Sequence, residues 1–279
     1  MSAIKLKVEG LNVCFVNGHK QTHAVRDVSF TLGREKLAIV GESGSGKSTV
    51  GRSLLKLHPG SARITAQAMQ FGDVDLLSAN EKVMQKIRGQ RISMVMQDPK
   101  YSLNPVVRVG QQIAEAYLAH HKASRAEARE RVLEMLAKVH IRDPQRVYDL
   151  YPHEVSGGMG QRIMIAMMVI TRPEIIIADE PTSALDVSVR QQVLSVLQEL
   201  VEQQEMGLIF VSHDLNLVRN YCDRVLVMYA GRVVESLAAC DLKHAQHPYT
   251  RGLLAALPSM DNRRERLPVL QRDPLWLTC

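Results

Sequence analysis

The chain has few aromatic residues and few cysteines, and it lacks a long hydrophobic run. Aromatic side chains make up 4% of its 279 residues, too few to predict a base-stacking platform for nucleic acid. No two of its cysteines form a C-x-x-C pair, which favours free thiols in a reducing compartment. The longest apolar stretch, Ile163–Ile170, is far below the roughly 18 residues that a membrane-spanning helix needs. We therefore expect any membrane association to come through a partner. The cysteines are Cys14, Cys222, Cys240 and Cys279.

The charge balance is basic but does not form a long patch. The formal net charge is +6, and the positive residues are scattered, with small clusters at Lys86–Arg91 and Arg263–Arg266. With so few aromatic residues, this pattern predicts that the chain does not bind nucleic acid. The length of 279 residues fits one large domain or one domain with an appendage, and an apolar share of 46% is enough for a sizeable core.

The first forty residues have the patterns of strands. Residues 6–9 and 24–30 alternate between apolar and polar side chains, which is typical of half-buried strands. The apolar run Leu37–Val40 predicts a buried strand that ends at Gly41. Helical spacing follows over residues 49–57. The sequence therefore predicts a strand, a glycine loop and a helix in succession.

Residues 75 to about 155 change character and favour helices. Ser124 to Glu127 fits a capping box, followed by a stripe of apolar residues at helical spacing. From Ile175 the alternation of strands and helices resumes, with a hairpin predicted at Ala230-Gly231. The tail after His247 is rich in proline, and we expect it to be loosely ordered. The pattern predicts an α/β domain with a helical insert at about residues 100–170.

The glycine loop matches the phosphate-binding pattern G-x-x-x-x-G-K-[ST] without a mismatch. Glycines let the backbone amides converge on phosphate oxygens, and the following helix adds its positive N-terminus. We expect Lys47 to lie between the β- and γ-phosphates, Ser48 to offer its hydroxyl to Mg²⁺, and Thr49 to help hold the α-phosphate side. The nucleotide-binding residues predicted here are Gly41, Ser43, Gly44, Ser45, Gly46, Lys47, Ser48 and Thr49.

Two acidic residues follow another buried strand. In Ile175–Glu180 an apolar run ends in Asp179 and Glu180, and such a strand end lies beside the phosphate loop in an open α/β sheet. Adjacent residues of a strand point in opposite directions, so the two acids are able to have different roles. We predict that Asp179 orients Mg²⁺ and that Glu180 polarises the attacking water.

Three further residues are candidates because of where they lie. Gln97 ends an apolar strand, where its amide is able to reach the metal or water. His213 ends another strand, and its imidazole is able to donate to the γ-phosphate. Phe15 precedes the loop, and we predict that it stacks on adenine, although an ordinary core position is the alternative. The other histidines lack comparable context, and we expect no metal cluster among them.

With these residues in place, the chain resembles the ATP-binding subunits of ABC transporters. Gly41–Ser48 is similar to the Walker A motif, Gln97 to the Q-loop glutamine, Ile175–Glu180 to Walker B, and His213 to the H-loop histidine. Two further segments carry the resemblance: Val155–Arg162 is similar to the signature segment, and Ser183–Asp186 to the D-loop. The similarity covers about residues 4–260.

A narrower resemblance points to the importer branch for oligopeptides, dipeptides and nickel. It is carried by the context of Gln97 and of Asp179-Glu180, and above all by His247–Leu254, which resembles the branch's C-terminal His-Pro-Tyr element. Residues 261–279 look like its continuation. Members with a long C-terminal extension carry closely spaced cysteines there, whereas Cys279 has no neighbour, and we expect no iron–sulfur site. Gly160 stands where a larger polar or basic residue is usual, and we expect a small effect.

The resemblance implies a fold and a mechanism. It implies a P-loop ABC ATPase domain with a mixed β-sheet core, an antiparallel β subdomain and a helical signature subdomain. Two such domains would sandwich two ATP molecules, with Ser156, Gly157 and Gly158 of one facing the γ-phosphate held by the other, and with Asp186 near the same interface. The cofactors implied are ATP and Mg²⁺, the latter held by Ser48, Gln97 and Asp179.

The implied partners are two membrane permeases, a second ABC ATPase that is the same or a related chain and, indirectly, an extracytoplasmic solute-binding protein. The chain would then lie at the cytoplasmic face of the inner membrane as a peripheral subunit. The alternative is a non-transport ABC ATPase of a soluble enzyme complex such as carbon–phosphorus lyase. Peptides, nickel and metal chelates all stay open as cargo, because the permeases and the binding protein choose it.

Overall fold

The computed structural model describes residues 4–183, 185–257, 273 and 276. The chain divides into two compact units. The first contains Met1–Ala79 and Ile209–Cys279, and the second contains Asn80–Leu208. None of the described helices is both long enough and apolar enough to cross a membrane. Cys14, Cys222 and Cys240 are free thiols, as expected, while Cys279 lies outside the described residues.

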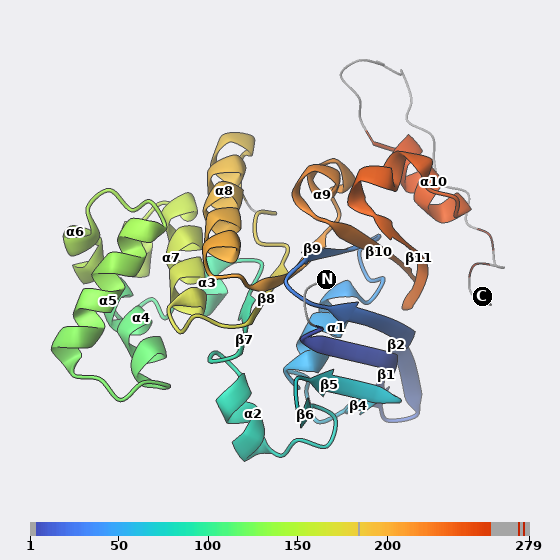
Figure 1. Cartoon of the computed structure of the whole chain (residues 1–279), viewed down its shortest axis with the longest axis horizontal. Helices are drawn as coiled ribbons and strands as arrows, with labels where there is room; N and C mark the ends of the chain where they lie inside the picture. Colours follow the sequence, from blue (N-terminus) through green and yellow to red (C-terminus); the bar gives the residue numbers. More distant parts are fainter. Residues whose placement is uncertain (1–3, 184, 258–272, 274–275, 277–279) are drawn as a thin grey trace. The chain divides into compact units, whose positions relative to one another are not determined.

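The first unit contains an antiparallel sheet in the strand order β2-β1-β5-β6, with β4 also paired to β1 (Figure 1). In β1, Leu6 and Val8 are fully buried while Lys7 between them is exposed, as the alternation predicted. This sheet is the antiparallel subdomain that the resemblance implied. Its strands are β1 (Leu6–Asn17), β2 (Lys20–Leu32), β4 (Ala62–Thr65), β5 (Ala68–Phe71) and β6 (Val74–Asp75).

The first unit also holds the strands β11, β10 and β3 and the part of β9 from Ile209 onward, in the strand order β11-β10-β3-β9. β3 runs parallel to β10, and β10 pairs antiparallel with β11 through the predicted turn at Ala230-Gly231, so the sheet is mixed. Leu37 to Val40 are all fully buried, as expected for a strand covered on both faces. The strands are β3 (Lys36–Val40), β9 (Gly207–Ser212), β10 (Arg224–Tyr229) and β11 (Arg232–Ala238). The helices are α1 (Lys47–Leu54), α9 (Leu215–Tyr221), the 3₁₀ helix Ala239–His244 and α10 (Pro248–Ala255).

The second unit combines two parallel strands, β7 and β8, with a group of helices. In this group α4 packs against α5, α6 and α7 (Figure 1). Ser124 caps α5 by accepting a hydrogen bond from the backbone N–H of Glu127, at 3.1 Å, which is one half of the predicted capping box. The strands are β7 (Ile92–Val95) and β8 (Ile175–Asp179). The helices are α2 (Glu81–Ile87), α3 (Pro99–Ser102), α4 (Val109–Leu118), α5 (Arg125–Lys138), α6 (Pro144–Asp149), the 3₁₀ helix Pro152–Glu154, α7 (Gly157–Val169) and α8 (Val187–Gln203).

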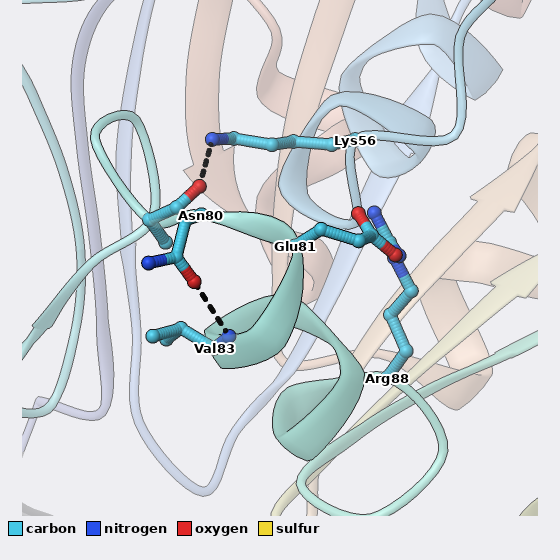
Figure 2. Close-up of polar contacts among 6 residues, drawn as sticks. Lys56, Asn80, Glu81, Val83 and Arg88 are labelled. Carbon is cyan, nitrogen blue, oxygen red and sulfur yellow. Dashed lines mark hydrogen bonds and ion pairs between the residues drawn. The ribbon is translucent and has the colours of Figure 1, made fainter.

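Local hydrogen bonds fix the start of the second unit. The Asn80 Oδ1 atom accepts from the Val83 N–H at 3.1 Å and so caps α2 (Figure 2). Arg88, which follows the last residue of the same helix, pairs with Glu81, its first residue, at 2.5 Å. On the preceding segment, the Lys56 ammonium donates to the Ala79 carbonyl at 2.6 Å.

Two expectations about helices need correction. The helix after the glycine loop begins at Lys47 rather than Thr49 and ends at Leu54, because the left-handed backbone of Gly46 starts it. The tail after His247 is not loosely ordered over Pro248–Ala255, which form α10. Proline at the first helical position is compatible with a helix, since that N–H would have no partner in the helix anyway. The predicted tail segment 261–279 lies outside the described residues, apart from Asp273 and Trp276.

Candidate functional site

The glycine loop lies between β3 and α1 and is enclosed by backbone from neighbouring strands. Gly46 has φ 99° and forms the left-handed N-cap of α1. A Cβ atom at Gly46 would overlap the carbonyl oxygen of Ala24, and one at Gly41 would overlap that of Met228. Neighbouring backbone therefore leaves no room for a side chain at Gly41 or Gly46. At Gly46 the left-handed backbone is a second reason for glycine.

The side chains of the loop suit a phosphate group. The Lys47 side chain is buried, and its ammonium donates to the carbonyl oxygens of Gly41, at 2.9 Å, and Glu42, at 2.8 Å. The Ser45 hydroxyl is buried and has no hydrogen-bond partner among the described residues. An ammonium, an unsatisfied hydroxyl and the N-terminus of α1 are the groups that bind phosphate oxygens. Ser43 and Gly44 are exposed on the loop, and Ser48 and Thr49 lie half-buried in the first turn of α1.

His213 shares a cavity with this loop. It follows β9 directly, is exposed, and precedes α9. A cavity of about 230 Å³ is lined by Gly41 and Glu42 of the loop, by His213, and by residues of α9 and α10. The structure thus brings His213 and the phosphate loop together in the first unit. The residues from α9, from α10 and from just after α10 are Leu215, Leu253, Ala256 and Leu257.

Phe15 lies in β1 and contacts a histidine. Its half-buried ring meets the His58 ring edge-on, with the ring centroids 5.5 Å apart. The Nε2 atom of His58 lies 3.2 Å from the Thr49 carbonyl and 3.0 Å from the Ser53 hydroxyl, both on α1. Burial lowers the pKa of His58, which favours its neutral form. The Phe15 ring is thus tied through His58 to the helix that follows the loop.

The second unit gathers three candidates at one edge of its strand pair. β7 and β8 are parallel, with Val95 opposite Ala178. Gln97 follows Val95 by two residues and is exposed, while Asp179 follows Ala178 directly and is 3% exposed. Because the carboxyl ends of parallel strands meet at the same edge, the amide and the two acids at 179 and 180 lie at neighbouring strand ends.

Glu180 has an unusual backbone conformation. Its φ is 48°, in the left-handed region that residues with a side chain rarely adopt. Its carbonyl oxygen accepts from the Ser183 N–H at 3.3 Å and the Ser183 hydroxyl at 3.2 Å, which supports the turn. Strained backbone of this kind clusters at functional sites, where the surrounding structure holds a side chain in one direction.

The signature segment forms the N-terminus of α7 and packs on α8. The Ser156 hydroxyl accepts from the Met159 N–H at 3.4 Å and caps α7. Gly157 is exposed, and a Cβ atom at Gly158 would overlap the Val189 side chain of α8. Glycine at position 158 therefore allows α7 to pack closely against α8. Gly160 is buried, but a Cβ there would make only ordinary contacts with Pro99, at 3.6 Å.

Asp186 caps α8 as well as belonging to the predicted D-loop. Its carboxylate accepts from the Val189 N–H at 3.0 Å and from the Ser188 hydroxyl at 2.8 Å. The Val189 N–H, followed by the Ser188 hydroxyl, lowers the pKa of this carboxyl below its usual range. The charged form is thus favoured at the positive end of α8.

The contact between α7 and α8 gives a testable expectation. We expect Gly158→Ala to destabilise the protein by about 1–3 kcal/mol, because the added methyl group overpacks against Val189. The double variant Gly158→Ala/Val189→Ala should recover most of this loss in a thermal melt, since Val189→Ala removes the atom that the methyl group meets. Equal destabilisation of the single and the double variant would contradict the packing explanation.

Two contacts at the candidate site escaped sequence reasoning. Tyr249 accepts a hydrogen bond from the backbone N–H of Glu42 in the phosphate loop, at 3.0 Å. The His-Pro-Tyr element had suggested only a family, although Pro248 after a capping His247 is a helix signal that could have located α10. The capping role of Asp186 could have been found from its place two residues before Ser188, at the start of a helical pattern.

Comparison with known proteins places the chain in a family. The family model described as ABC transporter matches residues 25–183, more than half of the chain. The chain belongs to the ABC transporter family. The prediction of an ABC ATPase with a mixed sheet and an antiparallel β subdomain is confirmed. ATP binding is confirmed by the family together with the similarity to a solved ATP-binding cassette.

Several relatives of this ABC protein are named as ATP-binding proteins of peptide import or transport. A putative peptide import ATP-binding protein of Brucella melitensis is 45% identical over 267 residues, covering 95% of this chain and 80% of that protein. The dipeptide transport ATP-binding protein of Bacillus subtilis is 46% identical over 268 residues, with the same coverage of 95% and 80%. The resemblance to the peptide branch is thus confirmed at the level of these relatives.

Solved structures of ABC proteins share the fold. A dimeric ATP-binding cassette bound to ADP and phosphate is similar with a TM-score of 0.75 at 26% identity, covering 84% of this chain and 98% of that one. A subunit of an ABC transporter complex from Clostridium perfringens is similar with a TM-score of 0.72 at 29% identity, covering 86% and 91%.

Proposed function

We propose that this ABC protein is the ATP-hydrolysing subunit of an importer that takes up peptides through partner permeases. The observation that carries the proposal is the phosphate loop, in which Gly46 closes on neighbouring backbone and the Lys47 ammonium lies over the loop carbonyls. The peptide cargo is supported by the names of relatives about 45% identical over most of the chain.

The loop would bind the nucleotide. Lys47 would move its ammonium from the Gly41 and Glu42 carbonyls to the β- and γ-phosphates, while Ser43, Gly44 and Ser45 would offer amides and a hydroxyl. Thr49 would hold the α-phosphate side, and Phe15 would stack on adenine. The domain that does this spans about residues 4–260 in our proposal, with the helical insert at about 100–170.

Oxygen ligands for Mg²⁺ are assigned to Ser48, Gln97 and Asp179. A hydroxyl, an amide oxygen and a carboxylate suit this hard cation, which prefers oxygen ligands and keeps several waters. When bound, Mg²⁺ would neutralise charge on the β- and γ-phosphate oxygens. Asp179 is 3% exposed at the end of β8, so its carboxylate would be screened little by solvent.

Hydrolysis would use Glu180 and His213. Glu180 would accept a proton from the attacking water as the water oxygen bonds to the γ-phosphorus and the bond from phosphorus to the β,γ-bridging oxygen breaks. Its left-handed backbone, which the hydrogen bond from Ser183 supports, would help to orient the carboxylate. His213 would donate a hydrogen bond to the γ-phosphate, and Gln97 would help place the water. Positioning and electrostatic stabilisation thus supply most of the catalysis.

We propose that a second ABC ATPase, either the same chain or a related one, completes each site. Ser156, Gly157 and Gly158 at the N-terminus of α7 would face the γ-phosphate bound by the partner, since a helix N-terminus favours an anion. Asp186 would lie near the same interface. A similar ATP-binding cassette that is dimeric and bound to ADP and phosphate supports the pairing of two ATPases.

The remaining partners would be two permeases and, through them, an extracytoplasmic binding protein. The chain would then be a peripheral subunit at the cytoplasmic face of the inner membrane. The alternative is an ATPase of a soluble enzyme complex such as carbon–phosphorus lyase, which would use the same ATP chemistry.

Affinity purification separates these two functions. The tagged chain would be isolated from detergent-solubilised native membranes and its companions identified by mass spectrometry. We expect two multi-span permeases and a second ABC ATPase. Recovery of soluble enzymes alone would overturn the transport proposal and leave the ATP chemistry intact.

A further inference from the structure

We propose that Tyr249 is a positioning residue for the phosphate loop, and that through it the C-terminal part of the chain sets the affinity for ATP. The inference rests on the proposed binding of ATP phosphates by residues 41–49. It names a contact that links this loop to a residue more than two hundred positions away in the sequence.

The contact joins a buried tyrosine to a half-buried residue of the loop. The Tyr249 hydroxyl accepts a hydrogen bond from the Glu42 backbone N–H at 3.0 Å, and the Tyr249 side chain is 0% exposed. The hydroxyl oxygen is the only part of the tyrosine that phenylalanine lacks. Removing the Tyr249 hydroxyl would take this hydrogen-bond partner away from the Glu42 N–H. Because losing a partner inside a protein costs free energy, we expect the conformation of the loop to change.

This amide belongs to a peptide group that also contacts the side chain of Lys47. The peptide bond between Gly41 and Glu42 is planar, so its C=O and N–H point in opposite directions. The Lys47 ammonium donates to the Gly41 carbonyl at 2.9 Å, and the Tyr249 hydroxyl accepts from the Glu42 N–H at 3.0 Å. Tyr249 and Lys47 therefore hold the two ends of one rigid group. Any rotation of that group on phosphate binding must be accommodated by the tyrosine.

The tyrosine is itself held by an aromatic cluster in the first unit. Its ring centroid lies 4.6 Å from that of Tyr229, the last residue of β10, and 6.0 Å from that of Trp276. Trp276 also meets Tyr229 edge-on at 5.6 Å. At the start of α10, the Nδ1 atom of His247 accepts from the Tyr249 N–H at 3.2 Å. The hydroxyl is thus presented to the loop by a packed support.

The helix that carries Tyr249 also reaches the proposed γ-phosphate contact. Leu253 of α10 lines the 230 Å³ cavity together with Gly41, Glu42 and His213. A shift of α10 would therefore act on the loop through Tyr249 and on the surroundings of His213 through this cavity. The C-terminal helix is in this way part of the wall of the nucleotide site.

The chain provides a reporter for this coupling. Trp276 is its only tryptophan, and it packs on both Tyr249 and Tyr229. A movement of the Gly41–Glu42 peptide group on ATP binding would be passed through the Tyr249 hydroxyl to the surroundings of the indole. We expect saturating ATP to change the Trp276 emission of the full-length chain.

The test compares Tyr249→Phe with a matched control, Tyr229→Phe. Both variants lose one hydroxyl from the same aromatic cluster, but only the Tyr249 hydroxyl bonds to the phosphate loop among the described residues. We expect Tyr249→Phe to raise the Kd and KM for ATP by roughly 3–10-fold, the range for loss of one hydrogen bond, with kcat at saturation little changed. For Tyr229→Phe, the Kd and KM for ATP should stay within about twofold of the wild-type values, since this variant keeps the hydrogen bond between Glu42 and Tyr249.

The outcomes separate this inference from the proposed function. If wild-type protein binds ATP and Tyr249→Phe binds it equally well, the positioning role is overturned alone. If wild-type protein does not bind ATP, the function of the loop itself fails. An equal loss of ATP affinity in both variants would indicate that the aromatic cluster as a whole is loosened, and would also overturn the positioning role of Tyr249. If the Trp276 emission of the wild-type protein does not change at saturating ATP, the coupling between the phosphate loop and the aromatic cluster is overturned. This result does not depend on how well Tyr249→Phe folds.

Discussion

Replacing Glu180 by glutamine should nearly stop ATP turnover without preventing ATP binding. Glu180→Gln keeps the size and polarity of the side chain but removes the carboxylate that would accept a proton from water. General-base catalysis contributes about 10²–10⁴-fold to a rate, so we expect a fall in phosphate release of at least about a hundredfold. The Kd for ATP should stay within about threefold of the wild type, because the loop that binds phosphates is unchanged.

The same strand offers a matched control. Glu174 lies just before β8, whereas Glu180 lies just after it, and Glu174 pairs with Arg91 at 2.7 Å. Glu174→Gln makes the same chemical change at the opposite end of the strand, and we expect turnover close to the wild type. Phosphate release at saturating ATP, with ATP binding measured on the same preparations, compares the two. Normal turnover in Glu180→Gln would remove Glu180 from the catalytic role.

The second large effect is expected at Gly46. Gly46→Ala places a methyl group against the carbonyl oxygen of Ala24 and strains a backbone with φ 99°. The loop must move to relieve the overlap, and the amides at the start of α1 move with it. We expect ATP affinity to fall by at least about a hundredfold, because overpacking costs about 1–3 kcal/mol and the phosphate contacts are lost in addition.

Gly60 supplies the control for this substitution. A Cβ atom at Gly60 would have no atom within 4 Å, and its φ lies outside the left-handed region. Gly60→Ala should therefore bind ATP like the wild type, which isothermal titration of the full-length chain would measure. If Gly46→Ala retained wild-type affinity, the close fit of the loop would have no bearing on nucleotide binding.

The local parts of the site were predictable from the sequence because their signals are local. The buried run Leu37–Val40, the spaced glycines and Lys47 all fall within eleven residues, and the structure has the predicted strand, loop and helix. Parallel pairing of β7 and β8 then brings Gln97 to the same edge as Asp179, as expected for strand ends in an α/β sheet.

The missed contacts depend on tertiary structure. Glu42 and Tyr249 are 207 positions apart, and no spacing rule relates a loop amide to a distant hydroxyl. Val189 meets the site of a Cβ at Gly158 only because α7 and α8 pack closely. The error at α10 had a different cause: the prolines after His247 led us to expect a loosely ordered tail, although proline is favoured in the first turn of a helix.

Peptide uptake by intact cells tests the central claim most directly. The chromosomal gene would be replaced by the Glu180→Gln allele, and uptake of isotopically labelled di- to pentapeptides would be compared with the wild type and with a deletion strain. We predict that the allele and the deletion lower uptake to the same extent, and that a wild-type copy restores it. Wild-type uptake in both strains would contradict a role for this chain in driving peptide import.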